Sequence, residues 1–197
     1  MPRIALDLNK EADRQKVKGQ WRLGPGLVPG EPNEGLVAQI LNTPARLAEY
    51  DDSKWEICNN IRQSISKGFT FAWYRIAVTL PAEIDGVALT DSRVYFETNV
   101  DNYGEIWVNG KIDRATGVII GINTQYRVEV MNKAVPGSKH IIVCLVVNGP
   151  LLNRWAVSLC AMQRSRLNRG TSFRMGLHRG RMFRAKMRNA QIHYAKH

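Results

Sequence analysis

The sequence has few cysteines, no long apolar run and no acidic residue in its last quarter, and each absence narrows the possible functions. Three cysteines among 197 residues, Cys58, Cys144 and Cys160, are too few and too widely spaced for a disulfide framework or a cysteine metal site. No apolar stretch approaches the roughly 20 residues that span a bilayer, and the first residues contain no apolar segment of a secretory signal peptide. We therefore expect a reducing, cytoplasmic setting, no membrane association, and no metal or other cofactor.

Because the end of the chain contains no Asp or Glu, the whole excess of positive charge lies there. Eleven of the 28 Lys and Arg residues lie in 151–197, so the first 150 residues carry 17 basic and 17 acidic side chains. A basic run of this kind can bind phosphates without sequence specificity. A solvated segment is the simpler interpretation, and nucleic acid is not the partner that we favour.

Residues suited to catalysis are also sparse. Glycoside hydrolysis needs two carboxylates about 5–10 Å apart across the substrate. Glu97, Asp101 and Glu105 are close in sequence, but they fall on a predicted strand and its bordering loop, where acidic side chains are usually solvated. His193 and His197 are four residues apart and lack a third metal ligand. We expect a protein that is not an enzyme.

The centre of the chain alternates apolar and polar residues with a period of two. This pattern predicts strands near 70–80, 92–98, 104–109, 125–131 and 139–148, separated by turn signals. Before them we expect one short helix near the N-terminus, and a helical turn that begins at Pro44 after Thr43. The fold class is therefore all-β, a β-sandwich. Its predicted core residues are Ile76, Val78, Phe96, Ile106, Val108, Val128, Ile142, Val143 and Val146.

The segment "NVDNYGEIWVNGK" places a tryptophan on the wrong side of a predicted strand. Ile106 and Val108 alternate with Trp107, and Asn109-Gly110 is a strong signal for a type I′ hairpin turn. If Ile106 and Val108 point into the core, Trp107 must point away from it. An exposed indole requires something to cover it: a ligand, a partner domain or another part of this chain.

Three segments in this order carry a family resemblance: "WYRIAVTLP", "SRVYFETNVDNYGEIWVNGKI" and "VEVMNKAVPGSKHIIVCLVVNGP". Together they resemble the galactose-binding-like jelly roll, the fold of the sugar-binding domain of glycoside hydrolase family two. They resemble still more closely the non-catalytic module beside the propeller of some bacterial gluconolactonase-like proteins. The resemblance covers about residues 17–151 and implies a carbohydrate-binding accessory module rather than a catalytic domain.

The resemblance weakens after residue 153. The family pattern closes with a strand soon after "NGP", whereas the similar segment "MRNAQIHYAK" follows only after a basic stretch. That stretch is either an insertion or the product of a shifted reading frame. We accordingly divide the chain into an N-terminal helix and arm (1–22), a jelly-roll sandwich (23–153), a basic insertion or non-native stretch (154–184) and a possible closing strand (185–197).

Sugar recognition needs an aromatic face for the ring and fixed polar groups for its hydroxyls. The hairpin around Trp107 offers both, so the predicted ligand-binding residues are Arg75, Asp101, Asn102, Tyr103, Glu105, Trp107 and Asn109. The predicted function is binding of a carbohydrate or related small ligand, with a catalytic partner domain in a hydrolase- or lactonase-type protein. The alternative is a scaffold module that docks a protein partner through the Trp107 face and binds no sugar.

Overall fold

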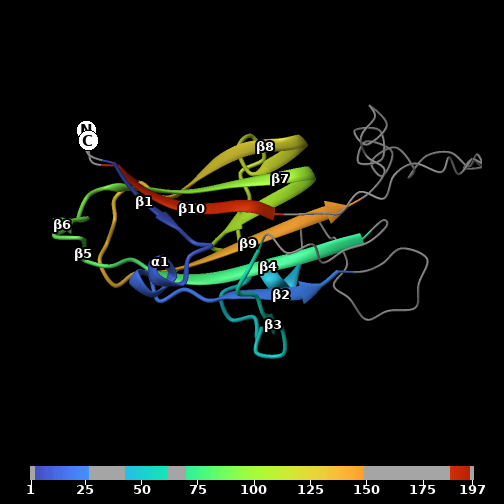
Figure 1. The fold of residues 1–197 in the computed structure, drawn as a ribbon, viewed down its shortest axis with the longest axis horizontal. Coiled ribbons are helices and arrows are strands. Elements are labelled where there is room, and N and C mark those ends of the chain that lie inside the picture. Colours follow the sequence, from blue (N-terminus) through green and yellow to red (C-terminus); the bar gives the residue numbers. More distant parts are fainter. Residues whose placement is uncertain (1–2, 27–42, 62–69, 149–186, 196–197) are drawn as a thin grey trace, which may run out of the picture.

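The structure is a computed structural model, and it describes residues 3–26, 43–61, 70–148 and 187–195. Strands dominate, and the fold is an all-β sandwich, as the sequence predicted (Figure 1). The elements are β1 (Arg3–Asp7), α1 (Glu11–Lys16), β2 (Trp21–Pro25), the short 3₁₀ helix η1 (Pro44–Arg46), β3 (Glu56–Ile57), β4 (Thr70–Thr79), β5 (Glu83–Ile84), β6 (Val87–Ala88), β7 (Arg93–Val108), β8 (Val118–Met131), β9 (Lys139–Asn148) and β10 (Met187–Ala195).

Two long strands, β7 and β8, belong to both layers of the sandwich. The first half of β7 pairs with β10, and its second half pairs with β9. Layer I therefore has the strand order β1, β10, β7, β8, whereas layer II continues from β8 and β7 through β9, β4 and β2 to β3 (Figure 1). All of these pairs are antiparallel. A bulge between Val100 and Asn102 marks the point where β7 passes from one layer to the other.

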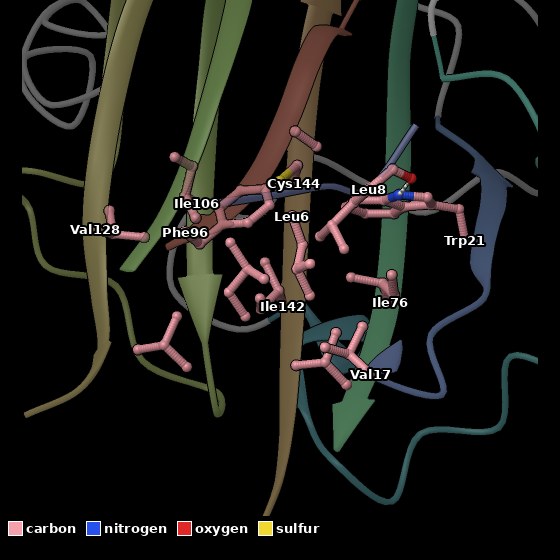
Figure 2. Close-up of a cluster of buried hydrophobic side chains, with 14 of the residues drawn as sticks. Leu6, Leu8, Val17, Trp21, Ile76, Phe96, Ile106, Val128, Ile142 and Cys144 are labelled. Atoms are coloured by element: carbon pink, nitrogen blue, oxygen red, sulfur yellow. Dashed lines mark hydrogen bonds between the residues drawn. The ribbon is translucent and has the colours of Figure 1, made fainter. Parts of the chain in front are cut away.

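The core lies between the layers, because alternate residues of each strand face inward. Figure 2 shows side chains of both layers meeting there, among them Phe96 and Val128 of layer I and Ile76 and Ile142 of layer II. The predicted core is confirmed: eight of the nine residues are buried, and Val108 is partly buried against the same cluster. Val143 is buried on the opposite face of layer II, in a second apolar cluster.

The N-terminal residues are part of the sandwich rather than an arm outside it. β1 pairs with β10, and β2 pairs with β4. Leu6, Leu8 and Trp21 are buried in the main core, and the Trp21 Nε1 donates a hydrogen bond to the Leu8 carbonyl at 3.2 Å (Figure 2). Sequence alternation over these five-residue strands was too short to reveal them. The segment 154–184 lies outside the described residues.

The strand β10 lies between β1 and β7, in the region where the sequence analysis expected a closing strand. Its inward side chains Ala190, Ile192 and Tyr194 are buried in the main core. In the part of the chain that the structure describes, no helix combines the length and apolar character needed to cross a bilayer.

The tip of the β7 hairpin adopts the turn that its sequence predicted. Asn109 and Gly110 have φ of 49° and 76°, the two left-handed conformations of a type I′ turn. Val108 and Lys111 exchange backbone hydrogen bonds of 2.8 and 3.0 Å across it.

Phe96 provides a test of this core. It is fully buried and its ring lies 6.3 Å from that of Trp21, so Phe96→Ala should lower the free energy of unfolding by about 3–5 kcal/mol. The matched variant Val135→Ala, at an exposed site, should change it by less than about 0.5 kcal/mol. Chemical denaturation measures both values. Equal effects of the two substitutions would contradict the assigned core.

Candidate functional site

Four of the predicted ligand-binding residues share the outer face of layer II. Pairing of β4 and β7 with the central strand β9 aligns Arg75, Val143 and Trp107 in one cross-strand row. The next row joins Trp73, Leu145 and Glu105, and a third joins Phe71, Val147 and Tyr103. The structure thus brings Arg75, Tyr103, Glu105 and Trp107 together.

This face is covered by another part of the chain itself, rather than by the ligand that the predicted binding residues implied. Trp107 is only 2% exposed. It packs in the second apolar cluster, which includes Ala45, Tyr50 and Trp55. These three residues belong to the segment 43–57, here termed the cover, which runs from η1 to β3. A remote part of the same chain therefore covers the Trp107 indole, which the sequence pattern placed outside the main core.

Arg75 fixes the cover to the sheet. Its side chain is 4% exposed, and its guanidinium donates hydrogen bonds to three carbonyls of the cover: Ala45 at 3.2 Å, Leu47 at 2.9 Å and Ala48 at 3.2 Å. It also forms an ion pair with Asp52 and lies 5.9 Å above the ring of Tyr50. A buried cation needs such partners. Arg75 was predicted to contact a ligand, whereas the contacts that the structure gives it are with the cover.

Asp52 serves two arginines that lie directly opposite each other on neighbouring strands. Arg22 of β2 is the register partner of Arg75 of β4. The second carboxylate oxygen of Asp52 lies 3.5 Å from the Arg22 Nε. Like charges opposed across strands repel each other, and Asp52 offsets that repulsion. No local pattern could predict this partner, because Asp52 precedes Arg75 by 23 residues.

A glycine permits the close approach of the cover. A Cβ atom at Gly24 would lie 2.4 Å from the indole of Trp55. Only glycine therefore lets this indole lie against the backbone of β2. The ring of Tyr50 meets Trp55 edge-on, with 5.5 Å between the ring centroids.

The carboxyl group of Glu105 is fully buried, and its two oxygens are only partly hydrogen-bonded among the described residues. Its Oε1 accepts a hydrogen bond from the Tyr103 hydroxyl at 2.7 Å and lies 3.9 Å from the Arg114 guanidinium. Its Oε2, like the Nε1 of Trp107, has no hydrogen-bond partner among the described residues. Burial raises the pKa of Glu105 above its ordinary value, and Tyr103, Arg114 and the nearby Trp107 N–H oppose this effect only in part.

Asn109 has a structural role at the hairpin tip. Its Oδ1 accepts from the Ile141 backbone N–H at 3.0 Å, and its Nδ2 donates to the His140 Nδ1 at 3.0 Å. The other ring nitrogen of His140 then carries the proton and donates to the Ser138 hydroxyl at 3.0 Å. Burial lowers the pKa of His140. Asp101 and Asn102 lie at the bend of β7, and the structure does not describe their side chains.

An open pocket of about 630 Å³ lies beside the second half of β8. Its volume falls in the usual range of small-ligand sites. Its aliphatic lining comes from Ile106, Val108, Val128 and Val130, and its polar and aromatic lining from Tyr95, Asn109, Lys111, Asp113, Thr116, Arg127 and Glu129. Asn109 is the one predicted ligand-binding residue in this lining. The other lining residues were not predicted to bind a ligand, because they come from three separate segments.

A buried carboxylate holds Arg127 at the rim of the pocket. The Glu97 Oε2 accepts from the Arg127 Nε at 2.8 Å and Nη2 at 2.6 Å, while the Gln125 amide donates to its Oε1. Burial alone would raise the pKa of Glu97, but the bonds from Arg127, the nearby His193 and the Gln125 amide outweigh it and lower the pKa. The Arg127 guanidinium lies 5.7 Å above the ring of Tyr95.

Solved structures similar to this chain include several glycosidases. The β-glucuronidase of Bacteroides uniformis matches with a TM-score of 0.57 and 14% identity, over 99% of this chain and 18% of that chain. A glycoside hydrolase family 2 member from Bacteroides cellulosilyticus DSM 14838 matches with a TM-score of 0.51 and 14% identity, over 96% and 20%. The Faecalibacterium prausnitzii β-glucuronidase matches with a TM-score of 0.52 and 13% identity, over 98% and 31%.

These identities show a shared fold, and the chain spans about a fifth of the length of the first of these glycosidases. These structures support the resemblance to glycoside hydrolase family two. They give no support to the resemblance to gluconolactonase-like proteins. Comparisons with protein-family models and with curated proteins found no match.

The role of Arg75 can be tested by Arg75→Met, which keeps the apolar stem. Loss of the guanidinium frees the cover and leaves Asp52 with one arginine, so the free energy of unfolding should fall by about 3–5 kcal/mol. Native-state proteolysis should then cut within residues 46–54. The comparison variant Arg22→Met removes a more exposed arginine that donates to the Ser53 and Trp55 carbonyls of the cover at 3.3 and 3.2 Å, so it should cost less, about 1–2 kcal/mol. Equal losses in both variants would exclude Arg75 as the main attachment.

The buried Glu105 predicts a pH dependence with a defined sign. Because its pKa is raised in the folded state, the folded protein binds more protons than the unfolded chain, and stability falls as the pH rises through the folded pKa. Glu105→Gln keeps the group neutral and should remove this loss, so it should stabilise the protein more at neutral than at acidic pH. Denaturation across pH 4–8 measures the difference. Glu83→Gln, at an exposed position, is the control and should leave the pH profile unchanged.

Proposed function

We propose that this chain is a non-catalytic accessory domain of a glycosidase-type protein, which binds a carbohydrate beside a catalytic partner domain. The fold of the glycosidases named above, shared over almost the whole chain, supports this placement. The chain matches only a small part of each glycosidase, and most of each of those proteins lies outside the matched region. This also supports the proposal that the chain is an accessory domain.

The pocket beside β8 is the observation that carries the ligand part of the proposal. Tyr95 supplies an aromatic surface, and Asn109, Thr116 and Glu129 supply groups that pair with hydroxyls. Arg127 is held in place by Glu97, so its position costs little entropy when a ligand binds. The lining combines four aliphatic residues and Tyr95 with six polar or charged residues, so it offers both an apolar surface and several groups for hydroxyls.

The predicted ligand-binding residues divide into two groups in this proposal. Asn109 lines the pocket, with its amide oriented by Ile141 and His140. Arg75, Tyr103, Glu105 and Trp107 support the site from the covered face, because Arg75 and Trp107 are occupied by the cover. The proposal thus keeps the hairpin of the sequence analysis and moves the ligand to its other side.

The alternative is a docking domain that binds a protein partner and no sugar. The fraction of each glycosidase that the chain matches supports it equally well, since a domain of this kind must contact its neighbours. The two proposals differ in one measurable property, which is binding of a free glycan by this chain.

Glycan-array screening followed by titration calorimetry tests the ligand. A carbohydrate that binds the wild-type chain should lose at least about tenfold in affinity in Tyr95→Ala and in Lys111→Ala, since one removes the aromatic surface and the other a rim cation. Lys54→Ala removes the same charge from the exposed surface of the cover and should bind as the wild type does. If no glycan binds, or if all three variants bind equally, the docking alternative replaces the pocket.

A further inference from the structure

One strand edge of the sandwich has a pattern that fits a second copy of this chain. In the sheet pairing of the described residues, β8 pairs with β7 only, so its other side is an edge of layer I (Figure 1). An edge strand presents unpaired backbone N–H and C=O groups that can pair with another strand. On the outer face of this edge, Gln125, Arg127 and Glu129 are exposed.

Charged side chains on an edge usually prevent pairing, but their order here makes one register favourable. Consider two copies of β8 that run antiparallel about a twofold axis at Val128. Arg127 of each copy then faces Glu129 of the other, and this places two pairs of opposite charge on the same face. Shifting the axis by one residue instead places Arg127 opposite Arg127, or Glu129 opposite Glu129. Opposite charges across strands stabilise a pair and like charges destabilise it.

The inward face agrees with the same register. Tyr126 of one copy faces Val130 of the other, and the two Val128 residues face each other. In this chain Val128 and Val130 are buried and Tyr126 packs against the main core. A twofold axis perpendicular to the sheet keeps inward faces together and outward faces together, as an isologous interface requires.

Glu129, the acidic residue of this edge, is available to bind a cation from a second copy. Arg127 already binds Glu97 through Nε and Nη2, and a guanidinium has five N–H donors. No hydrogen bond or ion pair of Glu129 is found among the described residues, and its side chain is exposed. A second copy would supply Glu129 with a cation. A bulge between Val94 and Tyr95 adds Val130 as an extra residue to β8 and shortens the regular part of this edge.

We propose that two copies of this chain associate through antiparallel pairing of β8 about Val128, with reciprocal contacts between Arg127 and Glu129. The short regular edge makes the association weak and concentration-dependent. The association is tested without any glycan present, because Arg127, Val128, Glu129 and Val130 also line the pocket and a paired second copy would compete with a ligand for them.

Sedimentation velocity of the full chain, at concentrations up to about 0.5 mM, provides the test. The wild type should show a monomer–dimer equilibrium. Glu129→Arg places a second guanidinium opposite Arg127 and should lower the association constant at least about tenfold. Arg127→Glu should do the same, and an equimolar mixture of these two variants should form heterodimers, because each pair again joins opposite charges.

Lys54→Glu reverses a charge on the cover and is the control, which should associate as the wild type does. A wild type that stays monomeric throughout this range, or a Glu129→Arg variant that associates as strongly as the wild type, would overturn the proposal. Glu129→Arg leaves the contact between Arg127 and Glu97 intact, so it decides the question even if Arg127→Glu fails to fold.

Discussion

The outer face of layer II depends on one buried cation. Arg75 carries a permanent charge, and transfer of such a group from water is costly unless partners replace the solvent. The cover supplies those partners as three carbonyls and the carboxylate of Asp52. Arg22 of β2 holds the end of the same segment by donating to the Trp55 carbonyl at 3.2 Å, and the cover as a whole closes the face over Trp107. A polar interaction thus determines where the largest apolar side chains of this face are buried.

The bend in β7 explains how one strand serves both layers of the fold. Its first half gives Phe96 to the core and its second half gives Ile106, because the alternation of β7 continues across the bend and the extra residue of the register shift lies in β8. The edge strand β8 follows it, so the hairpin forms one open side of the sandwich. The pocket lies there, between the Lys111–Gly117 segment and β8, where no further strand of layer I follows in the described sheet.

Local alternation made much of this fold predictable. The period of two identified the long strands and their inward residues, and Asn109-Gly110 identified the turn, because both signals lie within one element. The burial of Trp107 could not be predicted from the same pattern. Alternation fixes the face to which a side chain points, but the cover that buries it comes from a segment some 50 residues earlier. Thr43-Pro44 correctly indicated a helical turn, η1, yet nothing local shows that this turn packs on the sheet.

Two glutamates of β7 show how the environment, rather than the residue type, sets the charge of this sandwich. Glu97 and Glu105 are an even number of residues apart, and both point outward, one from each layer. Glu97 is paired with Arg127, which lowers its pKa, whereas burial of Glu105 outweighs the opposing effects of Tyr103, Arg114 and Trp107 and raises its pKa. Protonation of Glu97 costs stability as the pH falls through its folded pKa, and ionisation of Glu105 costs stability as the pH rises through its own. These opposite signs limit stability from both sides, so the two carboxyls together favour an optimum at a pH where Glu97 is charged and Glu105 is neutral.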